Sequence, residues 1–510
     1  MNEIYSKVFY RQHPNLKFDD SCDLTIKFET FEDSNKSPMI MMPEGVNAKA
    51  EKYELHIASA KSIVIKSDYI VGAIRAMDTL AQLFDYKKQY LTLHSLPISI
   101  QDEPRYGYRG FMLDVSREFY PMDVVKNIID GLRMTKINVL HLHLTDDDSW
   151  PIEMPSYPDM HKKTSFSADQ SYSVKDLQTI IDYAYKRGIK IVPEIDMPGH
   201  IRSIGDDAKF LDIITCYEKY YPHLMPDDHK IHGGPSSGVL NPAKNETYEF
   251  IKNVAKDITS IFKKSDFFHF GGDEVNKQNC WMKFDEIVDF MKSKNLSDEN
   301  ELFNFFNEEI SKIVSNYTQK EMIHWIYEKD MNSTWRNGSV VEFWGFAENI
   351  NAFKQAYPNQ KHILAPDDVF YLDWGVGNRY GGSLGTGYNT WANMEVFEPT
   401  DYYDEDDDRL LGGEACMWSE LCTPYNVYFK VWPRLAVMSS IFWEPSRKGK
   451  HDWETIVKDL VAFRDHIQAN GIPADKISSK YCEMHPDIVF KDGDQNSNFE
   501  LINNILKSMQ

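Results

Sequence analysis

The sequence has no long apolar run and few basic residues for its size. No apolar stretch approaches the roughly 18 residues of a membrane-spanning helix, which argues against membrane insertion. Lys and Arg total 56 against 78 Asp and Glu, and the net charge of -22 disfavours nucleic acid, whose phosphates bind clustered cations. The first twenty residues are polar and charged and contain no signal-peptide core, so no targeting signal is visible.

Phosphate-binding and zinc-binding motifs are also lacking. Neither a glycine-rich phosphate loop nor an H-E-x-x-H motif occurs at a useful position, so the sequence predicts no metal and no organic cofactor. The acidic run 401–408 (DYYDEDDD) is better interpreted as a solvated loop than as a metal site, because nothing orients its carboxylates. Six cysteines in 510 residues fit a reducing or an oxidising compartment.

What is present suggests two or more domains. The chain is 510 residues long and 42% hydrophobic, enough for a large core. Between Leu24 and Ile100 apolar and polar residues alternate, as in 53–57 (YELHI) and 62–66 (SIVIK), and a helical pattern follows from Ala73. We therefore expect a small α+β domain over residues 1–100.

From residue 101 short apolar strands alternate with amphipathic helices, the pattern of a parallel sheet built from βα units. The segment 121–135 begins with proline and carries an apolar stripe, which predicts a helix. We expect an α/β fold over residues 101–510, a (β/α)8 TIM barrel with a C-terminal helical extension. The eight strand ends are predicted near Asp114, Leu144, Glu194, Gly271, Trp325, Trp344, Tyr371 and Trp418.

The stretch 267–275 (FFHFGGDEV) is the most informative local pattern. Two adjacent carboxylates, Asp273 and Glu274, follow a short apolar strand and a Gly-Gly turn. Inside a strand, one of two consecutive side chains would face the apolar core, where an unpaired carboxylate is costly. At the carboxyl end of a barrel strand both can reach one pocket, and Gly271 and Gly272 leave room for a ligand. The pattern indicates a catalytic strand end, with a solvated acidic loop as the alternative.

Six motifs in a fixed order carry a resemblance to a known family. They are RGFMLDVSREFYP from Arg109, INVLHLHLTDDDSWP from Ile137, RGIKIVPEIDMPGH from Arg187, HFGGDE from His269, FYLDW from Phe370 and GGEACMWSE from Gly412. Together they resemble glycoside hydrolase family 20, the β-N-acetylhexosaminidases of the eukaryotic lysosomal type, between Tyr108 and Cys482. The resemblance implies a retaining exo-β-N-acetylhexosaminidase. Its substrates would be glycans or chitooligosaccharides ending in GlcNAc or GalNAc.

The resemblance assigns five catalytic roles, one of them to Tyr371, which would donate to the acetamido oxygen and help to align its attack. A retaining glycosidase usually has an acid and a nucleophile about 5 Å apart across the sugar, and this family is one of the substrate-assisted exceptions. Glu274 would be the general acid. Asp273 would hold the 2-acetamido group, whose oxygen attacks to give an oxazolinium intermediate. His200 and Asp146 would form a relay behind the acid, although a lone histidine is more often structural.

The acid must also be protonated at the working pH. We expect a hydrophobic surround and the neighbouring Asp273 charge to raise the pKa of Glu274.

Seven residues, Tyr371 among them, are expected to bind the sugar. Arg117 would hold its hydroxyls, because a guanidinium fork suits vicinal hydroxyls; Arg117 follows its strand, whereas Arg109 precedes it and is interpreted as structural. Indole faces stack on pyranose rings, although core packing is the ordinary explanation for a tryptophan. The residues that the resemblance assigns to the acetamido cage and the outer hydroxyls are Trp325, Trp344, Trp418, Tyr371, Asp373 and Glu420. Relatives that accept sulfated sugars carry Asn-Arg in place of Asp373-Trp374, so we expect neutral substrates.

The resemblance also bears on covalent structure and compartment. Cys216 and Cys280 match a family disulfide, and Cys482 matches one member of another pair whose partner is not found. It implies a lysosomal, vacuolar or secreted protein, a homodimer, and a strand and signal peptide preceding the start of this sequence. N-glycosylation sequons begin at Asn35, Asn245, Asn295, Asn316, Asn332 and Asn337.

Two other functions are open at this point. A catalytically silent glycan-binding protein could use the same barrel, since fold does not fix function. It would not need the proton donor that Glu274 supplies. A retaining hydrolase with its own nucleophile would act on sugars without an acetamido group.

Overall fold

The computed structural model describes residues 25–31, 41–217, 238–375, 387–446 and 451–480, with residue 484. Positions 60, 88–89, 94, 276, 279, 319, 329–330, 332 and 337 within these ranges are excluded. Cys482, Asn35, Asn332 and Asn337 therefore lie outside the described residues. No helix in the described part of the chain is long and apolar enough to cross a membrane.

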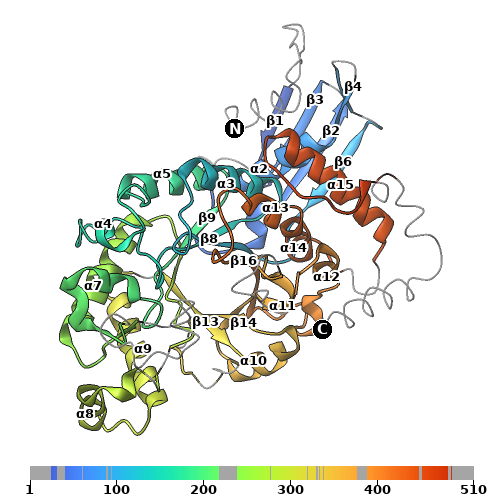
Figure 1. Cartoon of the computed structure of the whole chain (residues 1–510). Coiled ribbons are helices and arrows are strands. Elements are labelled where there is room, and N and C mark those ends of the chain that lie inside the picture. Colours follow the sequence, from blue (N-terminus) through green and yellow to red (C-terminus); the bar gives the residue numbers. More distant parts are fainter. Residues whose placement is uncertain are drawn as a thin grey trace.

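Eight parallel strands close into a barrel, seen in Figure 1 as the ring at the centre of the molecule. Around the barrel each strand pairs with its neighbour, and β16 closes the ring on β7. The fold class predicted from the sequence is confirmed. The strands are β7 (Tyr108–Asp114), β8 (Val139–His143), β9 (Lys190–Glu194), β12 (Phe267–His269), β13 (Glu321–Tyr327), β14 (Val340–Trp344), β15 (Lys361–Leu364) and β16 (Leu410–Met417).

The helices lie outside this ring and cover its apolar outer face (Figure 1). In α3 (Met122–Met134), Val125, Ile128, Ile129 and Leu132 are buried, as the apolar stripe predicts, and Pro121 is the N-cap residue. The other helices are α4 (His161–Thr164), α5 (Val174–Tyr185), α7 (Asn245–Ile261), α8 (Asp285–Ser293), α9 (Glu299–Ser315), α10 (Ile350–Ala356), α11 (Asp367–Phe370), α12 (Trp391–Glu395), α13 (Val427–Val431), α14 (Arg434–Trp443) and α15 (Trp453–Ala469).

The seventh strand differs from the sequence interpretation. It ends at Leu364, and the short helix α11 separates it from Tyr371, which the sequence places at a strand end. Tyr371 still reaches the barrel, because it makes an isolated bridge with Cys416 of β16. The sequence pattern merges the short strand and the apolar segment after it into one strand.

The N-terminal unit is a sheet with one helix against it. Its strand order is β1 (Thr25–Glu29), β3 (Ser62–Lys66), β2 (Tyr53–Ser59) and β6 (Ile98–Asp102), so the sheet runs to residue 102. The helix α2 (Ile70–Gln82) packs on the sheet, and β4 (Phe84–Lys87) and β5 (Tyr90–Leu93) form a separate hairpin. In Figure 1 the blue sheet lies at one side of the barrel, near α2, α3 and α15.

A buried ion cluster joins this unit to the barrel. Glu51 accepts from Arg75 of α2 (2.7 Å) and from Arg109 at the start of β7 (2.5 Å), and all three side chains are buried. Arg75 also donates to the carbonyls of Ile137 and Gly188. Arg109 is therefore a structural residue at the amino end of the barrel, remote from the strand ends that carry the predicted site.

Candidate active site

The predicted site residues gather at the carboxyl ends of the barrel strands. Each of the eight strands contributes to this end, directly or through the segment that follows it, as active sites of such barrels do. The strands and the residues that they or their following segments contribute are β7 with Arg117, β8 with Asp146, β9 with His200, β12 with Asp273 and Glu274, β13 with Trp325, β14 with Trp344, β15 with Tyr371 and Asp373, and β16 with Trp418 and Glu420.

A chain of charged contacts runs from Arg117 to the acid pair. Arg117 Nη2 lies 2.7 Å from Asp146 Oδ2, and Asp146 Oδ1 lies 3.3 Å from His200 Nδ1. The other ring nitrogen of His200, Nε2, is 3.5 Å from Glu274 Oε2 and 4.0 Å from Asp273 Oδ2. His200 thus lies between Asp146 and the acid pair, as the predicted relay requires.

The electrostatics of these contacts favour the charged forms of Asp146 and His200. Burial alone would raise the pKa of Asp146, but the Arg117 charge, followed by that of His200, holds this pKa well below its usual value. Burial likewise opposes the charged form of His200, yet Asp146 raises the His200 pKa well above its usual value. Asp146 and His200 therefore form an ion pair, in which the imidazolium can donate hydrogen bonds on both sides.

The two adjacent carboxylates have different surroundings. The Asp273 side chain is 10% exposed, and burial, with the Glu274 charge, raises the pKa of Asp273 to about 6. The Glu274 side chain is 37% exposed. The burial expected for Glu274 is therefore found at Asp273 instead.

Asp196 lies beneath Asp273 and explains the Gly-Gly turn. Its Oδ1 accepts from the amide of Gly272 (2.8 Å), and a Cβ on Gly271 would collide with the same carboxylate. Gly271 and Gly272 have φ of 65° and 92°, a region that favours glycine. Burial, followed by the Asp273 charge, raises the pKa of Asp196 well above its usual value. Asp196, His200 and Asp273 have the ligand types and spacing for a cation, but their mutual contacts already account for the arrangement.

Carboxylates surround Arg117. Its guanidinium contacts Asp114 (3.1 Å) and Asp146, and its Nε lies 3.7 Å from both Asp148 and Glu420. The guanidinium also lies over the Trp418 ring, 5.1 Å from its centroid. These contacts hold the arginine in one orientation at the strand ends, where a sugar hydroxyl could reach it.

The predicted aromatic residues form one cluster. The centroid of the Trp418 ring lies 6.0 Å from that of Trp325 and 6.3 Å from that of Tyr371. Trp344 packs against the same cluster and stacks on Tyr327 at 4.2 Å. Such a wall of rings is suited to a sugar and its acetamido group.

Asp373 and Glu420 are a second pair of interacting carboxylates. Burial and then the Glu420 charge raise the pKa of Asp373 well above its usual value. No described side chain hydrogen-bonds to either oxygen of Asp373; the backbone amides of Asp373 and Trp418 reach this carboxyl, and sugar hydroxyls could reach it as well.

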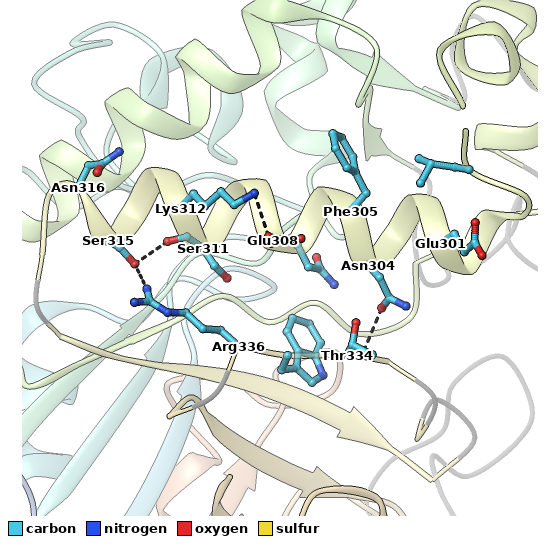
Figure 2. A pocket seen from close by; sticks show the side chains of 13 residues that line it. Glu301, Asn304, Phe305, Glu308, Ser311, Lys312, Ser315, Asn316, Thr334 and Arg336 are labelled. Atoms are coloured by element: carbon cyan, nitrogen blue, oxygen red, sulfur yellow. Dashed lines mark hydrogen bonds and ion pairs between the residues drawn. The ribbon is translucent and has the colours of Figure 1, made fainter. Parts of the chain in front are cut away.

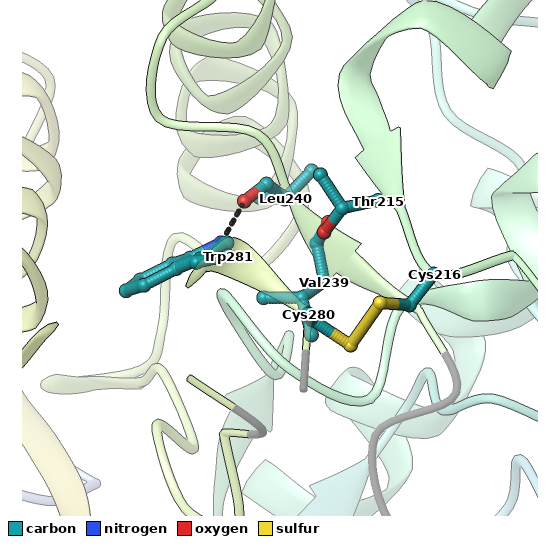
Figure 3. Close-up of a disulfide and its surroundings, with 6 residues drawn as sticks. All are labelled: Thr215, Cys216, Val239, Leu240, Cys280 and Trp281. Carbon is teal, nitrogen blue, oxygen red and sulfur yellow. Dashed lines mark hydrogen bonds between the residues drawn. A yellow bond between two sulfur atoms is a disulfide. The ribbon is translucent and has the colours of Figure 1, made fainter. Parts of the chain in front are cut away.

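A disulfide joins two loops that follow strands of the site. Cys216 is bonded to Cys280, with their Cα atoms 5.5 Å apart (Figure 3). Beside it, β10 (Ile214–Thr215) pairs with β11 (Val239–Leu240), and Trp281 Nε1 donates to the Leu240 carbonyl. The bond therefore connects the segment after His200 with the segment after Glu274.

A separate cavity of about 790 Å³ lies between α9 and the segment 334–336 (Figure 2). In Figure 2 Asn304 bonds Thr334, and Arg336 bonds Ser315 across it. Trp335 forms part of the lining, stacks on His324 and reaches Gly272. None of the predicted site residues lines this cavity. It is connected to the site through Trp335, which packs against the Gly-Gly turn.

An acid pair and a cluster of aromatic rings at the carboxyl end of a parallel barrel are features of a glycoside hydrolase. Comparison with known proteins gives the family. The model of the glycosyl hydrolase family 20 catalytic domain matches residues 106–446, and the chain belongs to this family. The resemblance predicted from the six motifs is confirmed.

Named relatives agree with this assignment. Beta-hexosaminidase 1 of Coccidioides posadasii is 31% identical over 471 residues, which cover 86% of this chain and 78% of the relative. The beta-hexosaminidase subunit beta of Mus musculus is 32% identical over 424 residues, covering 82% and 73%. The protein is therefore an enzyme, a glycoside hydrolase of the β-hexosaminidase type.

Solved structures share the fold. An exo β-N-acetylglucosaminidase from Vibrio harveyi, crystallised with N-acetylglucosamine, superposes with a TM-score of 0.73 at 24% identity and covers 93% of this chain and 73% of its own. A β-N-acetylhexosaminidase from Streptomyces coelicolor gives a TM-score of 0.68 at 24% identity, covering 89% and 86%.

Sequence reasoning missed several groups that shape the site. Asp114, His143, Glu194 and Asp196 are all buried and contact predicted site residues or lie directly beneath them. A signal was present, because each is a charged residue in or just after an apolar strand, where burial demands a partner. The partner itself lies on another strand and cannot be read from the local pattern.

Proposed function

We propose that the enzyme is a retaining exo-β-N-acetylhexosaminidase that uses the acetamido group of its substrate as the nucleophile. The observation that carries the proposal is the adjacency of Asp273 and Glu274, both within 4.0 Å of His200. Two carboxylates on one strand end cannot readily take opposite faces of a sugar ring. The attacking group must then come from the sugar.

In the first step Glu274 donates its proton to the glycosidic oxygen as the bond to the anomeric carbon breaks. Asp273, as a carboxylate, accepts a hydrogen bond from the acetamido N–H, and the acetamido oxygen attacks the anomeric carbon. Tyr371 donates to that oxygen and helps to align it. The product of this step is the free aglycone and a cyclic oxazolinium ion held in the aromatic cluster.

In the second step a water molecule enters from the side that the aglycone has left. Glu274, now ionised, takes a proton from this water, and the resulting hydroxide equivalent opens the oxazolinium ring at the anomeric carbon. Two inversions give retention of configuration. Arg117, Asp373 and Glu420 hold the hydroxyls of the terminal sugar, and His200 with Asp146 positions the acid.

The substrates on this proposal are glycoconjugates or chitooligosaccharides ending in GlcNAc or GalNAc. The names of the relatives support this class, since the similar solved structures include a β-N-acetylglucosaminidase and a β-N-acetylhexosaminidase. We also infer a homodimer and a lysosomal, vacuolar or secreted location from the family resemblance. Size-exclusion chromatography with light scattering tests the first, and fractionation of the source cells tests the second.

The central experiment is Glu274→Gln, assayed on an aryl β-N-acetylglucosaminide. Loss of a general acid costs about 10²–10⁴-fold in rate, and we expect kcat to fall by this amount. An aryl group that leaves without protonation should restore the first step, so an intermediate accumulates in a burst. The matched control is Glu249→Gln on the exposed face of α7, which should keep wild-type kcat. An unchanged kcat in Glu274→Gln, or binding without product release by the wild type, contradicts the proposal.

A further inference from the structure

Glu194 is a fully buried carboxylate at the end of β9, inside the barrel and directly below the site. Its two oxygens receive several N–H groups from other strands. Oε1 accepts from Trp325 Nε1 of β13 (2.7 Å), and Oε2 lies 2.6 Å from His143 Nδ1 and 3.0 Å from His141 Nε2 of β8. His269 of β12 is also near, with Nδ1 at 3.2 Å from Oε1.

One branch from Glu194 leads to the aromatic cluster. The indole N–H of Trp325 has one direction, so its bond to Glu194 sets the rotation of the ring. Trp325 lies between His269 (4.8 Å) and Trp418 (6.0 Å), measured between ring centroids. The plane that Trp325 offers to an acetamido group is thus set from below by Glu194.

The other branch leads to the acid. His143 contacts Glu194 through Nδ1 and Asp146 Oδ2 through Nε2 (2.9 Å), and its ring packs edge-on against Trp418 at 5.0 Å. Asp146 in turn holds both Arg117 and His200. A continuous path therefore runs from Glu194 through His143 and Asp146 to His200 and Glu274.

The charge states agree with these directions of hydrogen bonding. Burial opposes charge on His143, but Glu194 and then Asp146 raise the His143 pKa well above its usual value, so both ring nitrogens can donate. Burial would raise the pKa of Glu194, but the neighbouring histidines, His143 first, hold it well below its usual value. His269 stays neutral, because burial lowers its pKa to about 4. Glu194 is consequently an acceptor for every N–H that points at it.

We propose that Glu194 and His143 are positioning residues that tie the acetamido cage to the proton donor. They touch no substrate. Glu194 orients Trp325 directly, and it orients Asp146 through His143, so one buried carboxylate sets the geometry of both halves of the reaction. This inference rests on the function proposed above.

The variant that tests it is Glu194→Gln. An amide has one acceptor oxygen, so at least one of the N–H groups of Trp325, His143 and His141 would face the new NH2 donor. That conflict moves Trp325 or His143, and a displacement of about 1 Å in a reacting group costs about 100-fold in rate.

Glu414→Gln is the matched control. Glu414 is equally buried in the barrel, and it accepts from the same His141 (2.7 Å) and from Tyr108 (2.7 Å). An amide creates a similar donor conflict there. The conflict falls on Tyr108, on Glu342 and on His141, and it leaves in place the bonds that Glu194 makes to Trp325 and His143. Both variants should therefore lose stability to a similar extent, but only Glu194→Gln should displace Trp325 or His143.

Both variants are assayed on aryl β-glycosides of N-acetyl- and N-butanoyl-glucosamine. We expect Glu194→Gln to lose about 10- to 100-fold in kcat and about tenfold in its preference for the N-acetyl substrate, because a displaced Trp325 no longer closes the cage. Glu414→Gln should keep kcat and the preference for the N-acetyl substrate within about threefold of the wild type. Equal losses in the two variants, or an unchanged acyl preference in Glu194→Gln, overturn the inference.

Two further results keep the test decisive. Should Glu194→Gln not fold, benzothienylalanine in place of Trp325 keeps the size of the ring and exchanges the indole N–H for sulfur, which removes the bond to Glu194; a lowered acyl preference supports the inference, and a wild-type preference overturns it. The proposed function fails separately, if the wild type hydrolyses the aryl β-glucoside without an acetamido group as fast as the N-acetyl substrate.

Discussion

Replacing Asp273 with asparagine should stabilise the folded protein at neutral pH while it abolishes turnover. The fold raises the pKa of this carboxyl to about 6, from 3.8 for an ordinary aspartate. The folded state therefore resists ionisation of Asp273, and the unfolded state does not. Asparagine keeps the shape of the neutral acid and cannot ionise, so the variant escapes that cost.

The sign and size of the effect follow from the two pKa values. Below pH 3.8 the acid is protonated in both states and Asp273 contributes no difference. As the pH rises from 3.8 to about 6, the unfolded state ionises first and the folded state loses stability. A pKa difference of about 2 units between the two states destabilises the folded protein by about 3 kcal/mol above pH 6, and by about half of that at pH 5. Because the side chain is 10% exposed, solvent screening removes little of it.

The assay is thermal unfolding of the wild type and Asp273→Asn between pH 5 and 7.5. For a chain of this length, ~3 kcal/mol corresponds to a rise of about 3 °C in Tm, which should shrink toward pH 5. Asp102→Asn is the control of opposite sign. Burial would raise the pKa of Asp102, but Lys136, 2.6 Å away, lowers it, so this variant should lose stability at pH 7.5. A Tm of Asp273→Asn at or below that of the wild type at pH 7.5 refutes the reasoning.

Two other predictions concern the domain junction and the substrate. Glu51→Gln leaves the buried Arg75 and Arg109 without their carboxylate, and it should cost about 3–5 kcal/mol, read as a lowered Tm; an unchanged Tm would show that the cluster is not needed. A 6-sulfated aryl N-acetylglucosaminide should be a poor substrate relative to its neutral analogue, because Asp373 and Trp374 supply no cation to balance a sulfate beside Glu420; similar kcat/KM values would contradict this.

Much of the barrel could be predicted because parallel strands are buried on both faces. Such strands are continuous apolar runs that stop at a polar residue, and the predicted ends at Asp114, Glu194 and Trp344 are those of the structure. Tyr371 was misplaced because β15 has only four residues and the apolar segment 369–372, which begins in α11, looks like its continuation. Length and polarity alone do not separate a short strand from a following turn of helix.

The interior of the barrel could not be predicted in the same way. Alternation shows that His141 and His143 face the same side of β8, but not that Glu194 and Glu414 reach them from other strands. These contacts exist only once the ring has closed. Buried charges without partners would have been the warning, since each must find one in the fold.

The unequal burial of the two adjacent carboxylates gives the proposed mechanism its selectivity. The backbone turns sharply at Gly271 and Gly272 and at Glu274, whose φ is 48°, so the two side chains meet different surroundings. Asp273 lies among Asp196 and His200 and resists ionisation, whereas Glu274 is the more exposed. An acetamido N–H that donates to Asp273 favours its carboxylate and recovers the cost that burial imposed. A sugar without that N–H leaves the cost in place, so the preference for N-acetyl substrates arises from the same burial that destabilises the empty site.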